Sequence, residues 1–300
     1  MSSTDKQDIS DSFLNSPLGA GGTVTIIGTG LIGGSFALVL KDKGLAGKII
    51  GVDNNKEHQK KALELGIVDE VLPLKEAIVK SKLIVLAVPV DALTSLLPAV
   101  LDEVEDQVVM DMGSTKANVI ALVASHPKRG RFVASHPMWG TEYSGPEAAV
   151  KTAFSNKAAV ICDAKNSDTN ALDLVINLYQ QTGMHLIYMD AADHDLHAAY
   201  ISHISHITSF ALANTVLEKE KEEDAIFELA SAGFESTVRL AKSNAAMWVP
   251  IFRQNRENVL DVLNEHISQL RKFKSCLEKE NYEYLEELIK NANGIRRIIK

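Results

Sequence analysis

The chain has 300 residues, of which 46% are hydrophobic, and a formal net charge of -8. A single domain usually takes about 100 to 200 residues, so this length favours two domains with ample apolar material for their cores. The acidic excess disfavours nucleic acid as a partner, and an anionic substrate would need a local group of cations. Every apolar run falls short of the ~20 residues that span a bilayer, so no membrane association is expected.

The N-terminal stretch, residues 1–21, is acidic and has neither the apolar core of a signal peptide nor an arginine-rich pattern. We expect it to be a disordered leader. The two cysteines, Cys162 and Cys276, are far apart and match no metal or redox spacing. Such unpaired thiols are typical of a reducing compartment, so a cytoplasmic protein is expected.

The first strongly patterned stretch begins with a β-branched run at residues 24–27, which predicts a buried strand. Gly28, Gly30 and Gly33 follow in G-x-G-x-x-G spacing, and an apolar helix continues from them. Gly28 permits a tight turn, Gly30 lets the backbone approach a pyrophosphate, and Gly33 lets helix and sheet pack closely. The pyrophosphate would lie at the helix N-terminus, where free N–H groups and the helix dipole favour negative charge.

A second predicted strand, residues 48–52, ends on Asp53, about 20 residues after the last of these glycines. An acid at that place accepts hydrogen bonds from the adenosine ribose and repels a 2'-phosphate, and neither Asn54 nor Asn55 offers a cation. The stretch therefore predicts an NAD site rather than an NADP site. The alternative is a glycine-rich turn in another doubly wound fold. The predicted cofactor-binding residues are Gly28, Gly30, Leu31, Ile32, Gly33 and Asp53.

Strands and helices alternate up to about residue 189, which is typical of a mostly parallel sheet covered on both faces. Further strands are predicted at 68–72, 83–88, 107–111, 131–134, 158–162 and 185–189. We therefore expect a Rossmann-like α/β domain over residues 22–190. Residues 113–116 and the polar loop 135–147 follow two of the strands, at the sheet edge where such domains bind ligands.

The pattern changes at Asp190, after which the chain shows helical periodicity and no strand pattern. We expect residues 191–300 to form an all-α domain. One helix is predicted from about Asp193 to Leu217, apolar enough to be a buried central element. A helical half of this kind buries little surface alone, so a homodimer is expected.

Histidines are the most conspicuous candidates for chemistry. His136 lies between a strand and a proline, where it could act on a substrate hydroxyl as a general base or simply cap the loop. The long helix carries His194 and His197, then His203 and His206. At about 100° per residue the two pairs point to different sides, so a metal site is not expected. His206 could be a core histidine or could face the cleft between the domains.

Arg239 ends a small-residue segment, AGFESTVR, that leads into a helix. A guanidinium at such a turn suits bidentate capture of a carboxylate, and the alternative is a surface arginine. Trp248, which follows two alanines and a methionine, favours packing or a dimer contact over catalysis.

Seven motifs occur in order along the chain: GTGLIGGS at 28–35, D-x-GS-x-K at 111–116, SHPMWGTE at 135–142, ADHD at 192–195, SHISH at 202–206, GF-x(4)-R at 233–239 and MW at 247–248. Together they resemble the prephenate/arogenate dehydrogenase family of tyrosine biosynthesis, over about residues 23–260. The resemblance implies a Rossmann-like domain followed by a helical dimerisation domain. It also implies oxidation of prephenate with NAD and loss of carbon dioxide to give 4-hydroxyphenylpyruvate, or the same reaction on arogenate to give tyrosine.

The resemblance also implies roles for individual residues. His136 matches the histidine that hydrogen-bonds the substrate ring hydroxyl, and Ser114 matches the serine that orients it. His206 and Arg239 match residues that hold substrate carboxylates. Two further pocket positions are matched by Thr141 and by Trp248, the tryptophan reaching across the dimer.

One departure from the family concerns the acid that many members carry three residues before the arginine. This chain has Ser236 there, and Glu235 or Glu142 could substitute.

Three alternatives remain open. Arogenate carries an amine where prephenate has a keto group, and the cation-capable His206 favours prephenate. A β-hydroxyacid dehydrogenase shares the two-domain plan but would need a catalytic lysine in the helical domain, where none is convincing. A non-catalytic NAD-sensing protein would lack His136, Ser114 or Arg239, and all three are present.

Overall fold

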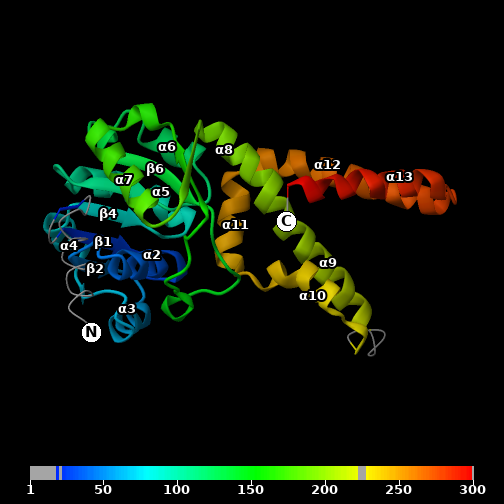
Figure 1. Cartoon of the computed structure of the whole chain (residues 1–300), viewed down its shortest axis with the longest axis horizontal. Coiled ribbons are helices and arrows are strands. Elements are labelled where there is room, and N and C mark those ends of the chain that lie inside the picture. The colour runs from blue at the N-terminus through cyan, green and yellow to red at the C-terminus, as the bar shows by residue number, and fades with distance from the viewer. Residues whose placement is uncertain (1–17, 20–21, 222–227, 299–300) are drawn as a thin grey trace.

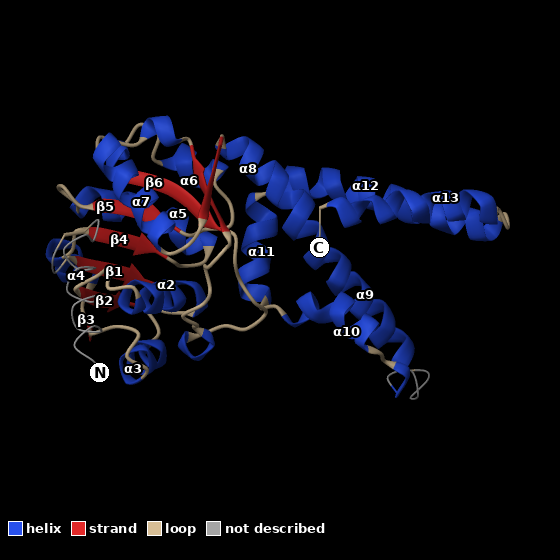
Figure 2. Cartoon of the chain, viewed as in Figure 1, coloured by secondary structure: helices blue, strands red, loops and turns tan. Residues whose placement is uncertain are grey.

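The computed structural model describes residues 18–19, 22–221 and 228–298. Nearly all of the expected leader, residues 1–21, lies outside the described residues. An α/β domain lies at one end of the molecule, and two helical arms extend from it (Figures 1 and 2). This arrangement confirms the predicted fold class, a Rossmann-like sheet domain followed by a helical domain.

The sheet has eight strands in the order β3-β2-β1-β4-β5-β6-β7-β8. Their bounds are β1 Thr23–Ile27, β2 Lys48–Val52, β3 Glu70–Val71, β4 Leu83–Leu86, β5 Val108–Asp111, β6 Phe132–Pro137, β7 Ala158–Cys162 and β8 His185–Met189. Neighbouring strands are parallel except for β6 and β7, which pair antiparallel. The order reverses between β1 and β4, and doubly wound sheets bind ligands beyond the carboxyl ends of the strands at such a point.

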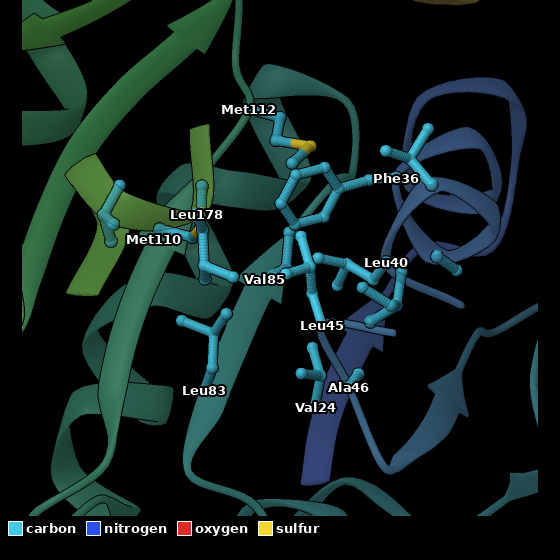
Figure 3. Close-up of a cluster of buried hydrophobic side chains, with 14 of the residues drawn as sticks. Val24, Phe36, Leu40, Leu45, Ala46, Leu83, Val85, Met110, Met112 and Leu178 are labelled. Atoms are coloured by element: carbon cyan, nitrogen blue, oxygen red, sulfur yellow. The ribbon is translucent and has the colours of Figure 1, made fainter. Parts of the chain in front are cut away.

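Both faces of the sheet are buried. Leu83 and Val85 of β4 belong to one apolar cluster, shown in Figure 3, whereas Ile84 and Leu86 belong to a second. Successive strand residues point to opposite faces, so this alternation requires a cover on each side. Helices supply that cover: α2 Leu31–Asp42, α3 Lys56–Glu64, α4 Leu74–Lys80, α5 Val90–Glu103, α6 Ala117–Leu122 and α7 Thr169–Gln181.

Strand β6 is longer than the predicted strand 131–134 and includes His136, which was expected in the following loop. The cause is its antiparallel partner β7, because the register continues from Ala134 opposite Cys162 to Pro137 opposite Ala159. His136 therefore has a sheet-bound backbone opposite Val160. It is the one residue of β6 that is not fully buried.

The helical half begins directly after β8. Its elements are α8 Ala191–Ala198, a π-helical turn η4 Ala199–His203, α9 Ile204–Glu220, α10 Ala232–Val238, the 3-10 turn η6 Arg239–Lys242, α11 Ala245–Gln254, α12 Arg256–Glu278 and α13 Tyr282–Ala292. Helix α11 lies beside the sheet domain, while α9 with α10 and α12 with α13 form the two arms (Figure 1). Within the described ranges, each helix is too short or too polar to cross a bilayer.

The helix predicted from Asp193 to Leu217 is present, but a π-helical turn interrupts it. The expectation that it is a buried central element is wrong for α9, in which Ser209 alone is buried. The reason is that α9 leaves the sheet domain with α10 packed along it, so its other side chains have few neighbours within one chain.

Candidate active site

The glycine loop between β1 and α2 has the shape that the sequence predicts. Gly28 has a φ of +93°, and a Cβ there would collide with the carbonyl oxygen of Ala87. A Cβ at Gly33 would collide with the carbonyl oxygen of Gly28. In contrast, a Cβ at Gly30 would meet no described atom within 4 Å. The space in front of Gly30 is therefore open.

Among the described residues, no side chain caps the N-terminus of α2, which begins at Leu31. Its free N–H groups and its dipole favour an anion in the space beside Gly30. The loop, Leu31 and Ile32 thus fit the pyrophosphate of a dinucleotide.

Asp53 follows β2 and is held against the same loop. Its Oδ2 accepts hydrogen bonds from the backbone N–H of Thr29 at 2.9 Å and from the Thr29 hydroxyl at 3.0 Å, while Oδ1 accepts from the N–H of Asn55 at 2.9 Å. A carboxylate has about four acceptor positions, so these bonds leave room for a ribose hydroxyl. The geometry fits NAD.

His136 on β6 contacts a buried pair on α8. Its Nδ1 lies 2.9 Å from Nε2 of His194, and Nδ1 of His194 lies 2.8 Å from Oδ1 of Asp195. Asp195 also accepts hydrogen bonds from the backbone N–H groups of Lys116, at 2.7 Å, and Ala117, at 2.9 Å, where α6 begins. One carboxylate thus joins the helical half to the sheet domain beside the imidazole of His136.

The pKa of His136 lies well below its usual value. Burial is the main cause, and the neighbouring His194, Lys116 and His203 lower it further because each would place a positive charge nearby. The imidazole is therefore neutral at ordinary pH. A neutral imidazole can accept a proton.

A buried ion pair holds the loop that carries Ser114. Lys116 Nζ contacts Asp111 Oδ2 and donates to the carbonyl oxygen of Ser135 at 2.8 Å. Asp111 accepts from the N–H groups of Gly113, at 2.9 Å, and Ser135, at 3.0 Å. The pair therefore fastens the Ser114 loop to the residue that precedes His136. Sequence reasoning noticed the D-x-GS-x-K motif but assigned no role to its acid and lysine.

Gln254, at the end of α11, was also missed. Its Oε1 accepts a hydrogen bond from the Thr115 hydroxyl at 2.8 Å, and its Nε2 donates to Oδ1 of Asp91 at 3.0 Å. It links the residue after Ser114 to the first turn of α5. A lone glutamine in a helix carries no sequence signal for such a contact.

His206, on α9, stacks on Trp248, with ring centroids 3.5 Å apart. Its Nδ1 lies 3.0 Å from the carbonyl oxygen of Ser202, so this nitrogen carries a hydrogen, and Nε2 of the neutral ring is without one. Burial is the main cause that lowers the pKa of His206, and Arg239 lowers it further. Trp248 is buried, and its Nε1 has no hydrogen-bond partner among the described residues. Within this chain, the tryptophan expected to reach across a dimer packs on the chain's own histidine.

Arg239 begins the turn η6 and reaches the loop after β6. Its Nη1 donates to Oε2 of Glu142 at 2.7 Å. Thr141 precedes Glu142 in that loop, and its hydroxyl oxygen accepts from the N–H of Tyr143 at 3.3 Å. The predicted carboxylate anchor therefore lies against the loop that continues from His136.

The prediction that the two histidine pairs of the long helix point to different sides is wrong for His194 and His203. His203 is buried close enough to His194 and His206 for each to lower its pKa, although burial is the larger cause. The π-helical turn at Ala199–His203 explains the difference, because it takes up one additional residue. His197 stays exposed.

The comparisons with known proteins agree with this geometry. Residues 36–188 match the family model described as the nucleotide-binding domain of prephenate dehydrogenase, and residues 190–291 match its dimerization domain. A prephenate dehydrogenase of Bacillus subtilis is 31% identical over 91% of this chain and 75% of its own length.

Two solved structures are similar over nearly the whole chain. Prephenate dehydrogenase from A. aeolicus, in complex with hydroxyphenyl propionate and NAD+, has a TM-score of 0.85 and 32% identity, covering 93% of this chain and 98% of that one. Arogenate dehydrogenase from Synechocystis has a TM-score of 0.73 and 26% identity, covering 92% and 99%.

Proposed function

The chain belongs to the prephenate dehydrogenase family, and we propose that it oxidises prephenate to 4-hydroxyphenylpyruvate and carbon dioxide in tyrosine biosynthesis. It is an NAD-dependent oxidoreductase. The observation that carries the proposal is the neutral, sheet-bound imidazole of His136 beside a loop that Arg239 reaches from the helical half. A hydroxyl substrate that also carries carboxylates suits both groups.

Prephenate has a hydroxyl on C4 of its ring and a carboxylate on the opposite quaternary carbon. Loss of hydride from C4 and departure of carbon dioxide together make the ring aromatic, and this supplies the driving force. When bound, NAD+ accepts the hydride. The protein has to align C4, take up the hydroxyl proton and bind the carboxylates without stabilising the ring carboxylate too strongly.

His136 takes the hydroxyl proton in this scheme. It is the accessible residue of β6, and the antiparallel ladder with β7 holds its backbone. Ser114 orients the same hydroxyl from the loop after β5. The buried Asp111 and Lys116 hold that loop in place relative to Ser135.

The carboxylates of prephenate bind to Arg239 and His206. The guanidinium of Arg239 is half-exposed and so can reach a ligand, and Nε2 of His206 can donate to a carboxylate when the ring is protonated. Trp248 stacks on the ring of His206, and its indole N–H has no partner among the described residues. Thr141 lies in the loop between His136 and Glu142.

Arogenate is the second candidate, because a similar solved structure is an arogenate dehydrogenase. Prephenate is favoured by the 31% identical relative, which is a prephenate dehydrogenase.

The active protein is a cytoplasmic homodimer formed through the helical domain, without nucleic acid or membrane partners. The match to a dimerization-domain model supports the dimer. An apolar cavity of about 510 Å³ between α9, α10 and α11 also supports it, because a second chain could cover this cavity.

A single assay tests the proposed function. The purified protein is mixed with prephenate or arogenate and with NAD or NADP, and the absorbance of the reduced cofactor is followed. We expect turnover with prephenate and NAD to exceed that of the other three combinations. Faster turnover of arogenate would make arogenate the substrate in place of prephenate. No turnover with either compound would reject the proposed function.

A further inference from the structure

The contact between His136 and the pair on α8 does more than pack two rings. His136 comes from a strand, whereas His194 and Asp195 lie 58 and more residues further along the chain. The rings meet edge to face at a centroid distance of 5.1 Å, and both His194 and Asp195 are buried. The two rings and the carboxylate of Asp195 form a chain of hydrogen bonds. The position of the proton in one bond therefore fixes its position in the next.

The carboxylate end sets those positions. Asp195 Oδ1 can only accept, so Nδ1 of His194 must carry the hydrogen between them. In a neutral His194, Nε2 is then bare and accepts from Nδ1 of His136. A neutral His136 with its hydrogen on Nδ1 has a bare Nε2. That is the nitrogen left for the substrate.

We propose that His194 and Asp195 are positioning residues that hold His136 in the tautomer whose Nε2 accepts the substrate hydroxyl proton. The proposal rests on the proposed function only for the identity of that hydroxyl. The tautomer itself is a property of the protein without substrate.

The proton step balances within this arrangement. As hydride leaves C4, the hydroxyl proton passes to Nε2 of His136 and a carbonyl forms at C4. The bond to the ring carboxylate then breaks, its electron pair enters the ring, and carbon dioxide leaves. The ring oxygen takes the proton back from His136. Meanwhile the positive imidazolium of His136 keeps its Nδ1 hydrogen and donates it to Nε2 of His194. The ring of His194 is in turn oriented by Asp195.

Asp195 cannot be replaced by its amide without a loss. Its two oxygens accept from His194 and from the N–H groups of Lys116 and Ala117. An asparagine has one acceptor oxygen, so its NH₂ must face either the N–H of Ala117 or both His194 and the N–H of Lys116, which share Oδ1. If it faces His194, the hydrogen of that ring moves to Nε2, and His136 must then carry its own hydrogen on Nε2.

The first experiment reads the tautomer directly. The full-length protein is labelled with ¹⁵N-histidine, and the Nδ1 and Nε2 shifts of His136 are assigned by comparison with His136→Asn. We expect a protonated Nδ1 and a bare Nε2 in the wild type, with this preference weakened in His194→Phe, which removes the acceptor for the Nδ1 hydrogen. A protonated Nε2 in the wild type overturns the proposal, whatever the activity.

The second experiment uses matched variants of His194. His194→Phe keeps a ring but no nitrogen, and His194→Gln places an amide oxygen near the position of Nε2. We expect His194→Phe to lower kcat by about 10²-fold with little change in KM, on the scale of a misplaced general base. His194→Gln should recover about tenfold of that loss, because it restores an acceptor for Nδ1 of His136.

His197→Phe is the control for these variants, because His197 lies on the exposed side of the same helix. It should keep the wild-type kcat. NAD affinity, measured by fluorescence titration, should be unchanged in every variant. If His194→Phe does not fold, the positioning role is tested by the kcat of His194→Gln and by the ¹⁵N shifts of His136 in the wild type. A His194→Gln protein no more active than a folded His194→Phe protein would contradict the positioning role.

The two hypotheses fail separately. If the protein shows the expected ¹⁵N shifts but does not oxidise prephenate, the proposed function is rejected and the tautomer assignment stands. A protein that oxidises prephenate with Nε2 of His136 protonated would keep the function and lose the assignment.

Discussion

Arg239 of the helical half donates a hydrogen bond from Nη1 to Oε2 of Glu142, 2.7 Å away, in the loop that continues from β6. The pKa of the Glu142 carboxyl is lowered, first by a hydrogen bond to its own backbone and then by Arg239, so the group is ionised at ordinary pH. Glu235 instead lies 3.9 Å from Lys242. Of the two acids that could serve in place of one at Ser236, Glu142 is therefore the one that meets the arginine.

In this ion pair Glu142 binds the guanidinium of Arg239, which we propose to bind a substrate carboxylate. Glu142 and the substrate therefore compete for Arg239. Glu142→Gln keeps the shape and removes the charge. We expect KM for prephenate to fall by about fivefold or less, as for a partly exposed pair, with kcat unchanged. Steady-state kinetics at fixed NAD measures this. A higher KM would mean that Glu142 instead holds Arg239 ready for the substrate.

Removing the guanidinium itself should mainly weaken binding. We expect Arg239→Ala to raise KM for prephenate by about 10-fold to 100-fold, since binding shared by ground and transition states is lost. The KM of Arg239→Lys should lie between those of the wild type and Arg239→Ala. An ammonium keeps the positive charge but cannot make the two parallel hydrogen bonds of a guanidinium. An unchanged KM with a reduced kcat would remove Arg239 from the role of anchor.

His136 should act on the chemical step. We expect His136→Asn to lower kcat by about 10²-fold or more, with KM for prephenate and affinity for NAD little changed. Stopped-flow measurement of cofactor reduction separates chemistry from product release. An unaltered kcat would exclude His136 from the mechanism.

The pH profile should reflect the low pKa of His136. Histidine normally titrates near pH 6.5, and His136 titrates well below that, so it stays neutral and able to accept a proton as the pH falls through 6.5. The groups that face it are His194, Lys116 and His203, with Asp195 beyond His194. We expect kcat/KM at pH 6 to be close to that at pH 7 and to fall only at lower pH. An acid limb centred at or above pH 6.5 would contradict the environment described for His136.

Stability should depend on pH through His203. Burial lowers the pKa of His203 from 6.5 to about 4, so between these values the unfolded chain binds more protons than the native protein. The contribution of neutral His203 to the free energy of unfolding is therefore fully present above pH 6.5 and is lost as the pH falls toward 4. One such group contributes a slope of ~1.4 kcal/mol per pH unit. Urea unfolding at pH 7, 6 and 5 measures the slope, which should be shallower in His203→Gln. An equal slope in that variant would mean that other groups cause it.

The local features of this protein were predictable from the order of its residues. Gly28 and Gly33 are required by collisions with atoms of the same β-α-β unit, and the alternation along β4 follows from strand geometry. Asp53 follows its strand beside the glycine loop because the two strands are parallel neighbours. Such constraints act over short stretches of chain or repeat with the period of an element, so a sequence pattern carries them.

The proton-carrying groups of the site could not be placed in this way. His136 owes its fixed backbone to β7, His203 lies near His194 beyond a π-helical turn, and Arg239 meets an acid 97 residues away. A histidine or an arginine has the same local pattern whether it is solvated or paired. The amino-acid sequence by itself determined the dinucleotide fold and the list of reactive residues. Only the tertiary structure decided which of them lie close enough to share a proton or a charge, because those interactions depend on distances across the fold.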